Sequence, residues 1–104
     1  EKRDPLLPQR LSSPQLAILS LNAYKENGVV NPVNAGTGPF ILRSVNGTSS
    51  AALDRFDGYW GEKAKASGID ASFVPDGAAR AAALRTGTAD IIEAIPVSQA
   101  PLLD

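Results

Sequence analysis

The carboxylates that could do acid–base chemistry are few, and their spacing argues against a catalytic centre. The candidates are Asp54, Asp57, Asp76, Asp90 and Glu93. A catalytic pair needs two carboxylates that face one site with separated pKa values. Asp90 and Glu93 lie three apart on an expected strand, hence on opposite faces, and Asp76 is expected to cap a helix. No acid–base pair is predicted.

Three arginines are candidates for holding a ligand carboxylate by bidentate pairing: Arg43, Arg80 and Arg85. Arg80 and Arg85 are five residues apart on an expected helix, which places them about 140° from one another. They do not form one clamp. We therefore expect solvated charges or local ion pairs at these positions.

Nucleophiles and metal ligands are scarce. Serines are plentiful, but the chain has no G-x-S-x-G elbow and no histidine to act as a base. The absence of histidine and cysteine removes the commonest zinc and copper ligands and the cysteine nucleophile. The sequence predicts a protein that is not an enzyme, with no catalytic residue, no metal site and no cofactor.

Two short stretches could contact a ligand through other chemistry. Gly36-Thr37-Gly38 could cradle a phosphate, but a phosphate loop needs a lysine and a helix after it, and here a strand is expected. Tyr59-Trp60 could stack on a peptide or a sugar, or the two rings could pin a long loop against a sheet.

The composition sets the broad class. The 104 residues carry a net charge of −1, with acidic and basic residues interspersed, so no basic surface for nucleic acid is predicted. Three Phe, two Tyr and one Trp are too few for a series of base-stacking rings. A single domain of this length buries roughly 65% of its unfolded surface, which predicts a modest core.

The first third of the chain, residues 1–35, is predicted to be a helical or irregular lead-in. The pattern favours one or two helical turns over 6–12 and an extended apolar run over 15–20. Asn22 is a candidate N-cap for a short helix over 23–27 that Gly28 ends, and a loop follows over 29–36.

Residues 36–104 are predicted to form a sheet with one helix. Asn46-Gly47 favours a hairpin with a type I′ turn. Asp76 is a candidate N-cap, Gly87 the residue just past the helix, and Leu84 the only large apolar residue to anchor the helix. The expected elements are strands over 39–45, 48–56, 69–75 and 89–95, and a helix over 77–86. Strand–helix–strand is a βαβ unit with a right-handed parallel crossover, so the predicted fold class is α/β with a mixed sheet.

Three separated motifs follow one another in order. The first is Gly36-Thr37-Gly38-Pro39-Phe40 after Asn31-Pro32-Val33, the second is Tyr59-Trp60-Gly61, and the third comprises Asp76, Arg80, Leu84, Gly87 and Asp90. This series resembles the nickel/dipeptide/oligopeptide-binding family of ABC-transporter substrate-binding proteins (family 5 extracellular solute-binding proteins). The motif residues are its structural fingerprint in this chain. Asn34-Ala35 before the glycines and Phe56-Asp57 before the tyrosine depart from the family pattern, so no ligand or ligand-binding residue is assigned.

The resemblance implies a fold and a function. Family members are several times longer, so residues 1–104 are expected to be a single segment of the first lobe of a bilobal protein with a periplasmic-binding-protein-like (type II) fold. Such a protein binds peptides, nickel chelates or similar solutes at the periplasmic or extracellular face, with a lipoprotein anchor as one option, and delivers them to an ABC permease. Tyr59-Trp60 recurs among members with different ligands, which favours packing.

Two other functions stay open at this point: a sensor domain of a cytoplasmic transcription regulator and a stand-alone protein-interaction module. A segment separated from its lobe also keeps unpaired strand edges and apolar faces. We therefore expect the 104-residue chain to form a homodimer.

Overall fold

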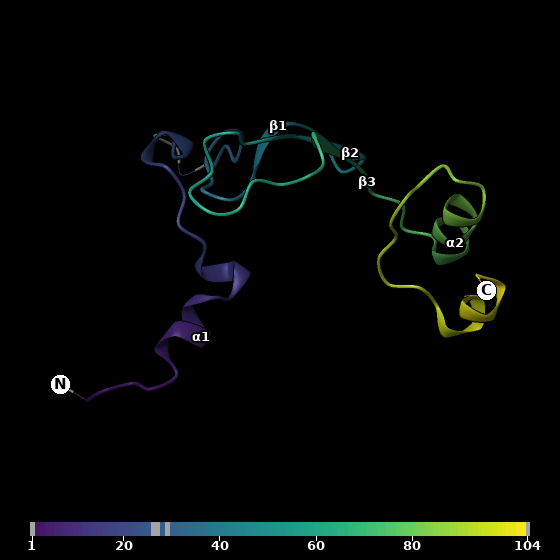
Figure 1. Ribbon diagram of the computed structural model, residues 1–104, viewed down its shortest axis with the longest axis horizontal. Coiled ribbons are helices and arrows are strands. Elements are labelled where there is room, and N and C mark those ends of the chain that lie inside the picture. Colours follow the sequence, from purple (N-terminus) through teal and green to yellow (C-terminus); the bar gives the residue numbers. More distant parts are fainter. Residues whose placement is uncertain (1, 26–27, 29, 104) are drawn as a thin grey trace.

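The computed structural model describes residues 2–25, 28 and 30–103, and its elements follow one another along an elongated molecule. Helical turns come first, a three-stranded sheet lies in the middle, and helix α2 lies at the far end beside the C-terminal turns (Figure 1). The longest dimension is 52 Å and the radius of gyration is 17.6 Å. A compact chain of this length has a radius of gyration of about 13 Å.

The N-terminal segment consists of short helical turns. Helix α1 (Leu7–Leu11) has Pro8 in its first turn, where no intrahelical N–H is needed, and this confirms the predicted turns over 6–12. Two 3₁₀ turns follow, η1 (Pro14–Leu16) and η2 (Leu21–Ala23). The extended run predicted over 15–20 is wrong at its start, because the turn that begins at Pro14 continues to Leu16.

The helix predicted over 23–27 is wrong. Tyr24 has an extended backbone and pairs with Val30 in an isolated antiparallel bridge. Gly28 has a φ of +75°, and its N–H donates to the Lys25 carbonyl at 2.9 Å. Positions 26 and 27 of that helix, and position 29 of the loop after it, lie outside the described residues.

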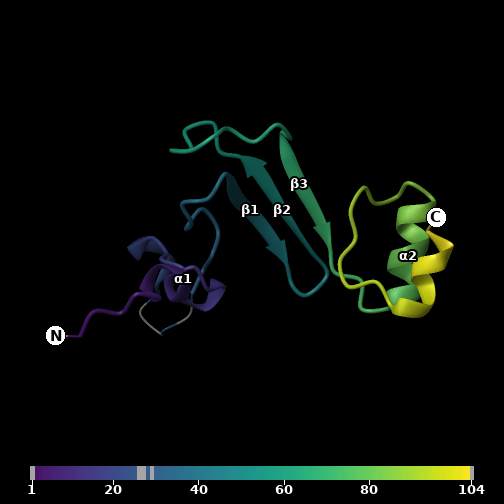
Figure 2. The same ribbon diagram turned by 60° about the horizontal axis from the view of Figure 1, so that its bottom comes forward.

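The sheet is antiparallel and has the order β1-β2-β3, which Figure 2 shows from its face. Its strands are β1 (Phe40–Asn46), β2 (Ser50–Arg55) and β3 (Gly68–Ser72). Three of the four predicted strands are confirmed, although the third ends at Ser72 rather than at residue 75. The register shifts at Arg43, because Leu42 faces Leu53 whereas Ser44 faces Ala52.

The hairpin predicted at Asn46-Gly47 is confirmed, but the predicted turn type is wrong. A type I′ turn needs positive φ at both central residues. Gly47 has a φ of +53°, whereas Asn46 is not among the described residues with positive φ. The Ser49 N–H donates to the Asn46 carbonyl at 3.0 Å, so Gly47 and Thr48 are the central residues.

Helix α2 (Gly77–Arg85) begins and ends as predicted. Asp76 Oδ2 accepts the Ala79 N–H at 2.7 Å, and Gly87 follows the helix with a φ of +74°. The expectation that Leu84 anchors the helix stays a prediction. Leu84 is half-buried, whereas Ala81 is the buried residue of α2.

The α/β class is confirmed, but the predicted βαβ unit is wrong. Residues 89–95 form no strand, and every strand pair in the described part of the chain is antiparallel. The segment lies across an open trough from β3, and the described residues supply no strand beside it to pair with. Ala94 interrupts it with a φ of +53°. The chain then ends in the 3₁₀ turns of η3 (Val97–Leu102).

The observed core is much smaller than the sequence predicted. Among the described residues, the buried apolar ones are Ala23, Ala35 and Ala81. The accessible surface is 8690 Å², whereas a compact protein of 10.8 kDa exposes about 5500 Å². Against an unfolded surface of about 15,700 Å², the chain buries about 45%, not the expected 65%. Its apolar surface is largely uncovered.

Candidate functional site

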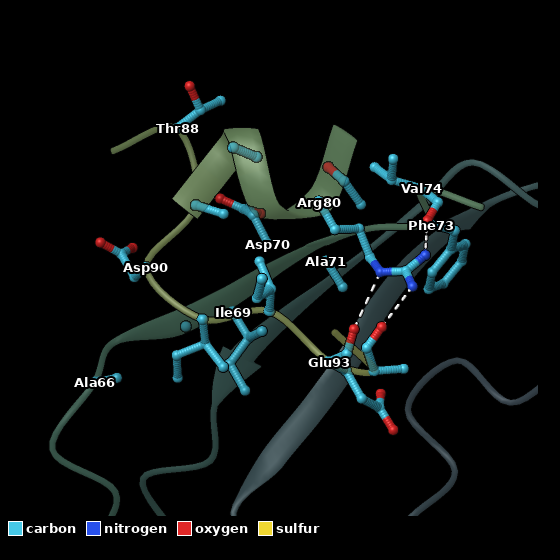
Figure 3. A pocket seen from close by; sticks show the side chains of 17 residues that line it. Ala66, Ile69, Asp70, Ala71, Phe73, Val74, Arg80, Thr88, Asp90 and Glu93 are labelled. Carbon is cyan, nitrogen blue, oxygen red and sulfur yellow. Dashed lines mark hydrogen bonds between the residues drawn. The ribbon is translucent and has the colours of Figure 1, made fainter. Parts of the chain in front are cut away.

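Arg80 is the most highly connected polar side chain of the structure. Its Nη1 donates to the carbonyls of Val74 at 2.7 Å and Pro75 at 3.0 Å, on the chain entering α2. Its Nε and Nη2 donate to the carbonyls of Glu93 at 3.1 Å and Ala94 at 2.7 Å, on the chain that follows α2 (Figure 3). Arg80 therefore ties together two segments that are separated by a whole helix.

The expectation of a solvated or ion-paired charge at Arg80 is wrong. The side chain is half-buried, and its partners are backbone carbonyls rather than carboxylates. One signal in the sequence could have revealed this role. A cation near a helix N-terminus is disfavoured by the helix dipole, so an arginine four residues after the N-cap needs a compensating contact.

The other arginines behave differently. Arg43 pairs with Asp54 across β1 and β2 at 3.3 Å, as expected for a local ion pair, and both side chains are exposed. Arg85, in the last turn of α2, is exposed and belongs to none of the ion pairs found in the described part of the chain.

An open trough of about 1260 Å³ lies between β3 and the segment after α2. One bank is formed by residues 68–74 and the other by residues 88–94, and Arg80 and Ala83 of α2 also line the trough. Figure 3 shows the Arg80 side chain reaching toward Val74 and Glu93. The trough was not anticipated from the sequence. Small-molecule sites are enclosed pockets of roughly 300–1,000 Å³, so this large open trough is not the shape of a ligand pocket.

A hydrogen bond joins the first and second motifs. Trp60 Nε1 donates to the Thr37 carbonyl at 3.2 Å. The Tyr59 and Trp60 rings lie 4.9 Å apart at 48°. Tyr59 is half-buried, but Trp60 is 80% exposed, so its ring is held by its N–H and not by burial against the sheet. At Gly61 a Cβ would come within 2.8 Å of the Tyr59 ring, which explains a glycine there.

The glycines of the first motif do not need their conformational freedom. Gly36 and Gly38 have no positive φ, and a Cβ on either would meet nothing within 4 Å. The left-handed residue of this loop is Asn34, with a φ of 54°. Pro39 and Phe40 lead into strand β1 as predicted, and the Pro39 carbonyl accepts the Phe56 N–H at 2.9 Å.

Asp57 holds the loop after β2. Its Oδ1 accepts from Lys63 Nζ at 2.8 Å and from Arg55 Nε at 2.9 Å. These two contacts, Lys63 first and Arg55 second, hold the pKa of the Asp57 carboxyl below its ordinary value of 3.8. The carboxylate is exposed and its partners are structural, so the arrangement fixes a loop.

The remaining acidic candidates lie in two places. Asp76 caps α2, whereas Asp90 and Glu93 both line the trough. The expectation that these two lie on opposite faces of a strand is wrong, because residues 89–95 are irregular. Across the described ranges, no group of three His, Cys, Asp or Glu residues is arranged to hold a metal ion. No helix in those ranges has the length and apolarity to cross a membrane.

The family comparison matches all of residues 1–104 to the group described as bacterial extracellular solute-binding proteins, family 5 Middle. The chain belongs to this family. Its glutathione-binding relative GsiB from Salmonella paratyphi A is 37% identical over 97 residues, and its nickel-binding periplasmic relative from Escherichia coli is 31% identical over 87 residues. These alignments cover 89% and 81% of this chain but only 19% and 17% of the two relatives.

Solved structures of related binding proteins agree with this family 5 assignment. The nickel ABC transporter protein from Bacillus halodurans matches 98% of this chain with a TM-score of 0.79 and 31% identity. DppA from Helicobacter pylori, solved with the peptide STSA, matches 66% of it with a TM-score of 0.60 and 31% identity. The chain spans 21% and 14% of those two proteins. Its fold is that of part of a periplasmic-binding-protein-like structure.

Proposed function

We propose that this chain is a scaffold segment in the first lobe of a longer, bilobal protein, the extracytoplasmic substrate-binding component of an ABC importer. The observation that carries the proposal is the structural likeness to the Bacillus halodurans protein over 98% of the chain. The family match over all 104 residues supports the same function. The chain covers about a fifth of its relatives, so the ligand site needs chain beyond these residues.

The chemistry of the described residues supports a scaffold rather than a ligand site. The guanidinium of Arg80 donates hydrogen bonds to four backbone carbonyls. Asp76 is occupied by a helix cap and Asp57 by two cations. These three polar side chains are thus already used within the segment.

The proposed ligand class is a small peptide, a nickel chelate or a similar solute. Relatives are named for glutathione and nickel binding, and one solved relative holds the peptide STSA. The proposed location is the periplasmic or extracellular face of the cytoplasmic membrane, with or without a lipid anchor, and the proposed partner is an ABC permease. The role is non-enzymatic.

Calorimetry on the full-length protein tests this function. The titrants are glutathione, a dipeptide series, the peptide Ser-Thr-Ser-Ala and Ni²⁺ with and without a small chelator. We expect one class to bind with a dissociation constant below about 10 μM, and mass spectrometry to recover the ligand unchanged. Binding of DNA without any of these solutes, or chemical conversion of the ligand, would contradict the proposal.

A further inference from the structure

The tip of the β1–β2 hairpin carries an asparagine followed by a glycine, Asn46-Gly47. An asparagine side chain can react with the main chain that follows it, because the next backbone nitrogen can attack the side-chain carbonyl carbon, Cγ. A glycine makes this attack easiest, since it has no Cβ to hinder the close approach of the two groups. Whether the reaction takes place in a folded protein depends on how the turn holds these atoms.

The turn holds the peptide between Asn46 and Gly47 with its nitrogen facing outward. The Asn46 carbonyl accepts two hydrogen bonds from Ser49, one from the N–H at 3.0 Å and one from Oγ at 2.7 Å. The described residues include no cis peptide bond, and in a trans peptide the carbonyl and the following N–H point in opposite directions. The Gly47 N–H therefore points out of the turn, and within the described residues it makes no hydrogen bond.

The space around this peptide is open. Asn46 and Gly47 are both exposed, and a Cβ on Gly47 would meet nothing within 4 Å. The side-chain amide of Asn46 makes no hydrogen bond to the rest of the described chain. No contact there restrains either of the two reacting groups, and water reaches both.

The second asparagine–glycine pair of the sequence is Asn27-Gly28. Asn27 itself lies outside the described residues. The nitrogen that would attack it is engaged, because the Gly28 N–H donates to the Lys25 carbonyl at 2.9 Å. The two pairs are alike in sequence, but they differ in the freedom of the attacking nitrogen.

The two glycines that follow an aspartate, Gly58 and Gly77, lie in restrained places. Asp57 is ion-paired with two cations, which keep it ionised, and a carboxylate is a poor target for a nucleophile. Asp76 accepts a hydrogen bond at the start of α2, and Gly77 is the first residue of that helix. Neither aspartate has the freedom of Asn46.

The three remaining asparagines are not followed by glycine. Asn22 and Asn34 each precede a buried alanine, whose Cβ hinders the approach to the nitrogen. Asn31 precedes a proline, which has no N–H to lose. Asn46 therefore combines the reactive sequence with an unrestrained geometry.

We propose that Asn46 is a site of spontaneous deamidation in the folded protein, and that isoaspartate forms at the hairpin tip. The Gly47 nitrogen loses its proton to water or hydroxide and forms a bond to Asn46 Cγ. The bond from Cγ to Nδ2 breaks, and ammonia leaves, so that a succinimide ring remains. Water then opens the ring: addition at Cγ gives aspartate, and addition at the main-chain carbonyl carbon gives isoaspartate. The reaction does not depend on which solute the protein binds.

The isoaspartate changes the hairpin in two ways. It adds one negative charge to a chain whose net charge is −1. It also lengthens the main chain between positions 46 and 47 by one methylene, because the chain then runs through Cβ and Cγ. Hairpin register is fixed by turn type and loop length. The longer main chain therefore loosens the contact of Ser49 with position 46 and the pairing of Ser50 beyond it.

Ageing of the folded full-length protein at mildly alkaline pH tests the proposal. Peptide mapping by mass spectrometry, with an isoaspartyl methyltransferase as the label, follows each asparagine. We expect Asn46 to react about ten times faster than Asn27 and the three asparagines that precede other residues. In urea, Asn27 and Asn46 should react at similar rates, because both precede glycine. Reaction at Asn46 in urea but not in the folded protein would overturn the proposal, because the fold would then shield the site.

A pair of glycine variants tests the attacking atom. Gly47→Ala places a Cβ beside the nitrogen and should slow the reaction at Asn46 about tenfold. Gly36→Ala is the control, since Gly36 also has open space around its Cα, and it should leave the rate at Asn46 unchanged. Repeating the comparison in urea keeps it valid if Gly47→Ala does not fold. An unchanged rate for Gly47→Ala in both conditions would contradict attack by the Gly47 nitrogen.

Hydrogen exchange measures the consequence for the hairpin. In aged protein that carries isoaspartate, the Ser49 amide should exchange about tenfold faster than in fresh protein. The Phe73 amide, which donates to the Ser49 carbonyl at 2.8 Å, is the internal control. Asn46→Asp supplies the charge without the extra methylene and should keep the Ser49 amide protected. Equal protection of Ser49 in the fresh, aged and Asn46→Asp proteins would show that isoaspartate leaves the hairpin closed, against the proposal.

Discussion

At the scale of single residues, Arg80 shows why an arginine is needed and not only a positive charge. Its planar guanidinium directs donors to carbonyls on both sides of α2. A lysine ammonium presents its donors from one point and cannot reach both segments. The interaction is therefore a matter of geometry, and a charge-conserving substitution tests it.

We expect Arg80→Lys to lower the free energy of unfolding of the full-length protein by about 2 kcal/mol, because at least one charge-assisted bond is lost. Urea denaturation measures the change, and limited proteolysis between residues 88 and 96 reports local release. Arg85→Lys is the matched control, since Arg85 is exposed on the same helix. Equal effects of the two variants would show that Arg80 contributes only charge.

Asp57 provides a second test at this scale. Because its pKa is lowered in the folded chain, the stability it contributes is present above the unfolded pKa and is lost as the pH falls through the folded pKa. An NMR titration should place its midpoint below 3.8. Lys63→Gln should raise that midpoint, whereas Lys65→Gln should leave it unchanged. The effect on overall stability should be small, since exposed ion pairs contribute little.

At the scale of elements, the signals that predicted correctly are local ones. Asp76, Gly87 and Asn46-Gly47 act through their own backbone and their near neighbours, and each begins or ends an element where expected. The failures concern elements that need a distant partner. Residues 89–95 have a strand-like sequence, but a strand forms only beside another strand, and the described chain offers none there.

In the candidate site, too, local features could be predicted from the sequence and long-range contacts could not. The cap at Asp76 follows from residue type and position. The role of Arg80 depends on carbonyls that the fold brings from 13 and 14 residues away. The trough depends on which edge of β3 stays unpaired, and hydrophobic spacing alone does not specify strand order.

Substitutions at Gly87 and Gly36 form a matched pair that tests how helix α2 ends. Gly87 has a φ of +74°, and a residue with a Cβ costs about 1–2 kcal/mol in that conformation. Gly87→Ala should therefore lower the thermal midpoint of the helical signal in circular dichroism. Gly36→Ala is the control, because Gly36 has no positive φ and open space around its Cα. A similar loss for both would show that the positive φ of Gly87 is not what makes alanine costly there.

At the scale of the whole molecule, the chain is too open to be stable as an independent globule. Its radius of gyration is 17.6 Å where about 13 Å is usual, and its buried apolar residues are three alanines within the described ranges. A hydrophobic core supplies most of the favourable free energy of folding. The isolated chain should unfold over a broad range of urea, whereas the full-length protein should unfold cooperatively.

The same exposed surface leads to the prediction that the isolated chain self-associates. Leu7 and Leu11 are 48% and 58% exposed and lie on one face of α1, since residues four apart share a face. A net charge of −1 offers little repulsion. Light scattering over a dilution series should show dimers that dissociate as the concentration falls, because association depends on mass action.

Two variants identify the surface responsible. Leu7→Lys combined with Leu11→Lys should shift the chain toward monomer, because it places charge on the apolar face of α1. Val97→Lys changes one isolated side chain that is 90% exposed, and it should leave the association unchanged. If both variants dimerise like the parent chain, the contact lies elsewhere, and the free edge of β3 becomes the surface to test. If the parent chain is monomeric up to roughly 100 μM, the exposed leucines are too few to drive contact, and apolar exposure alone does not make this segment associate.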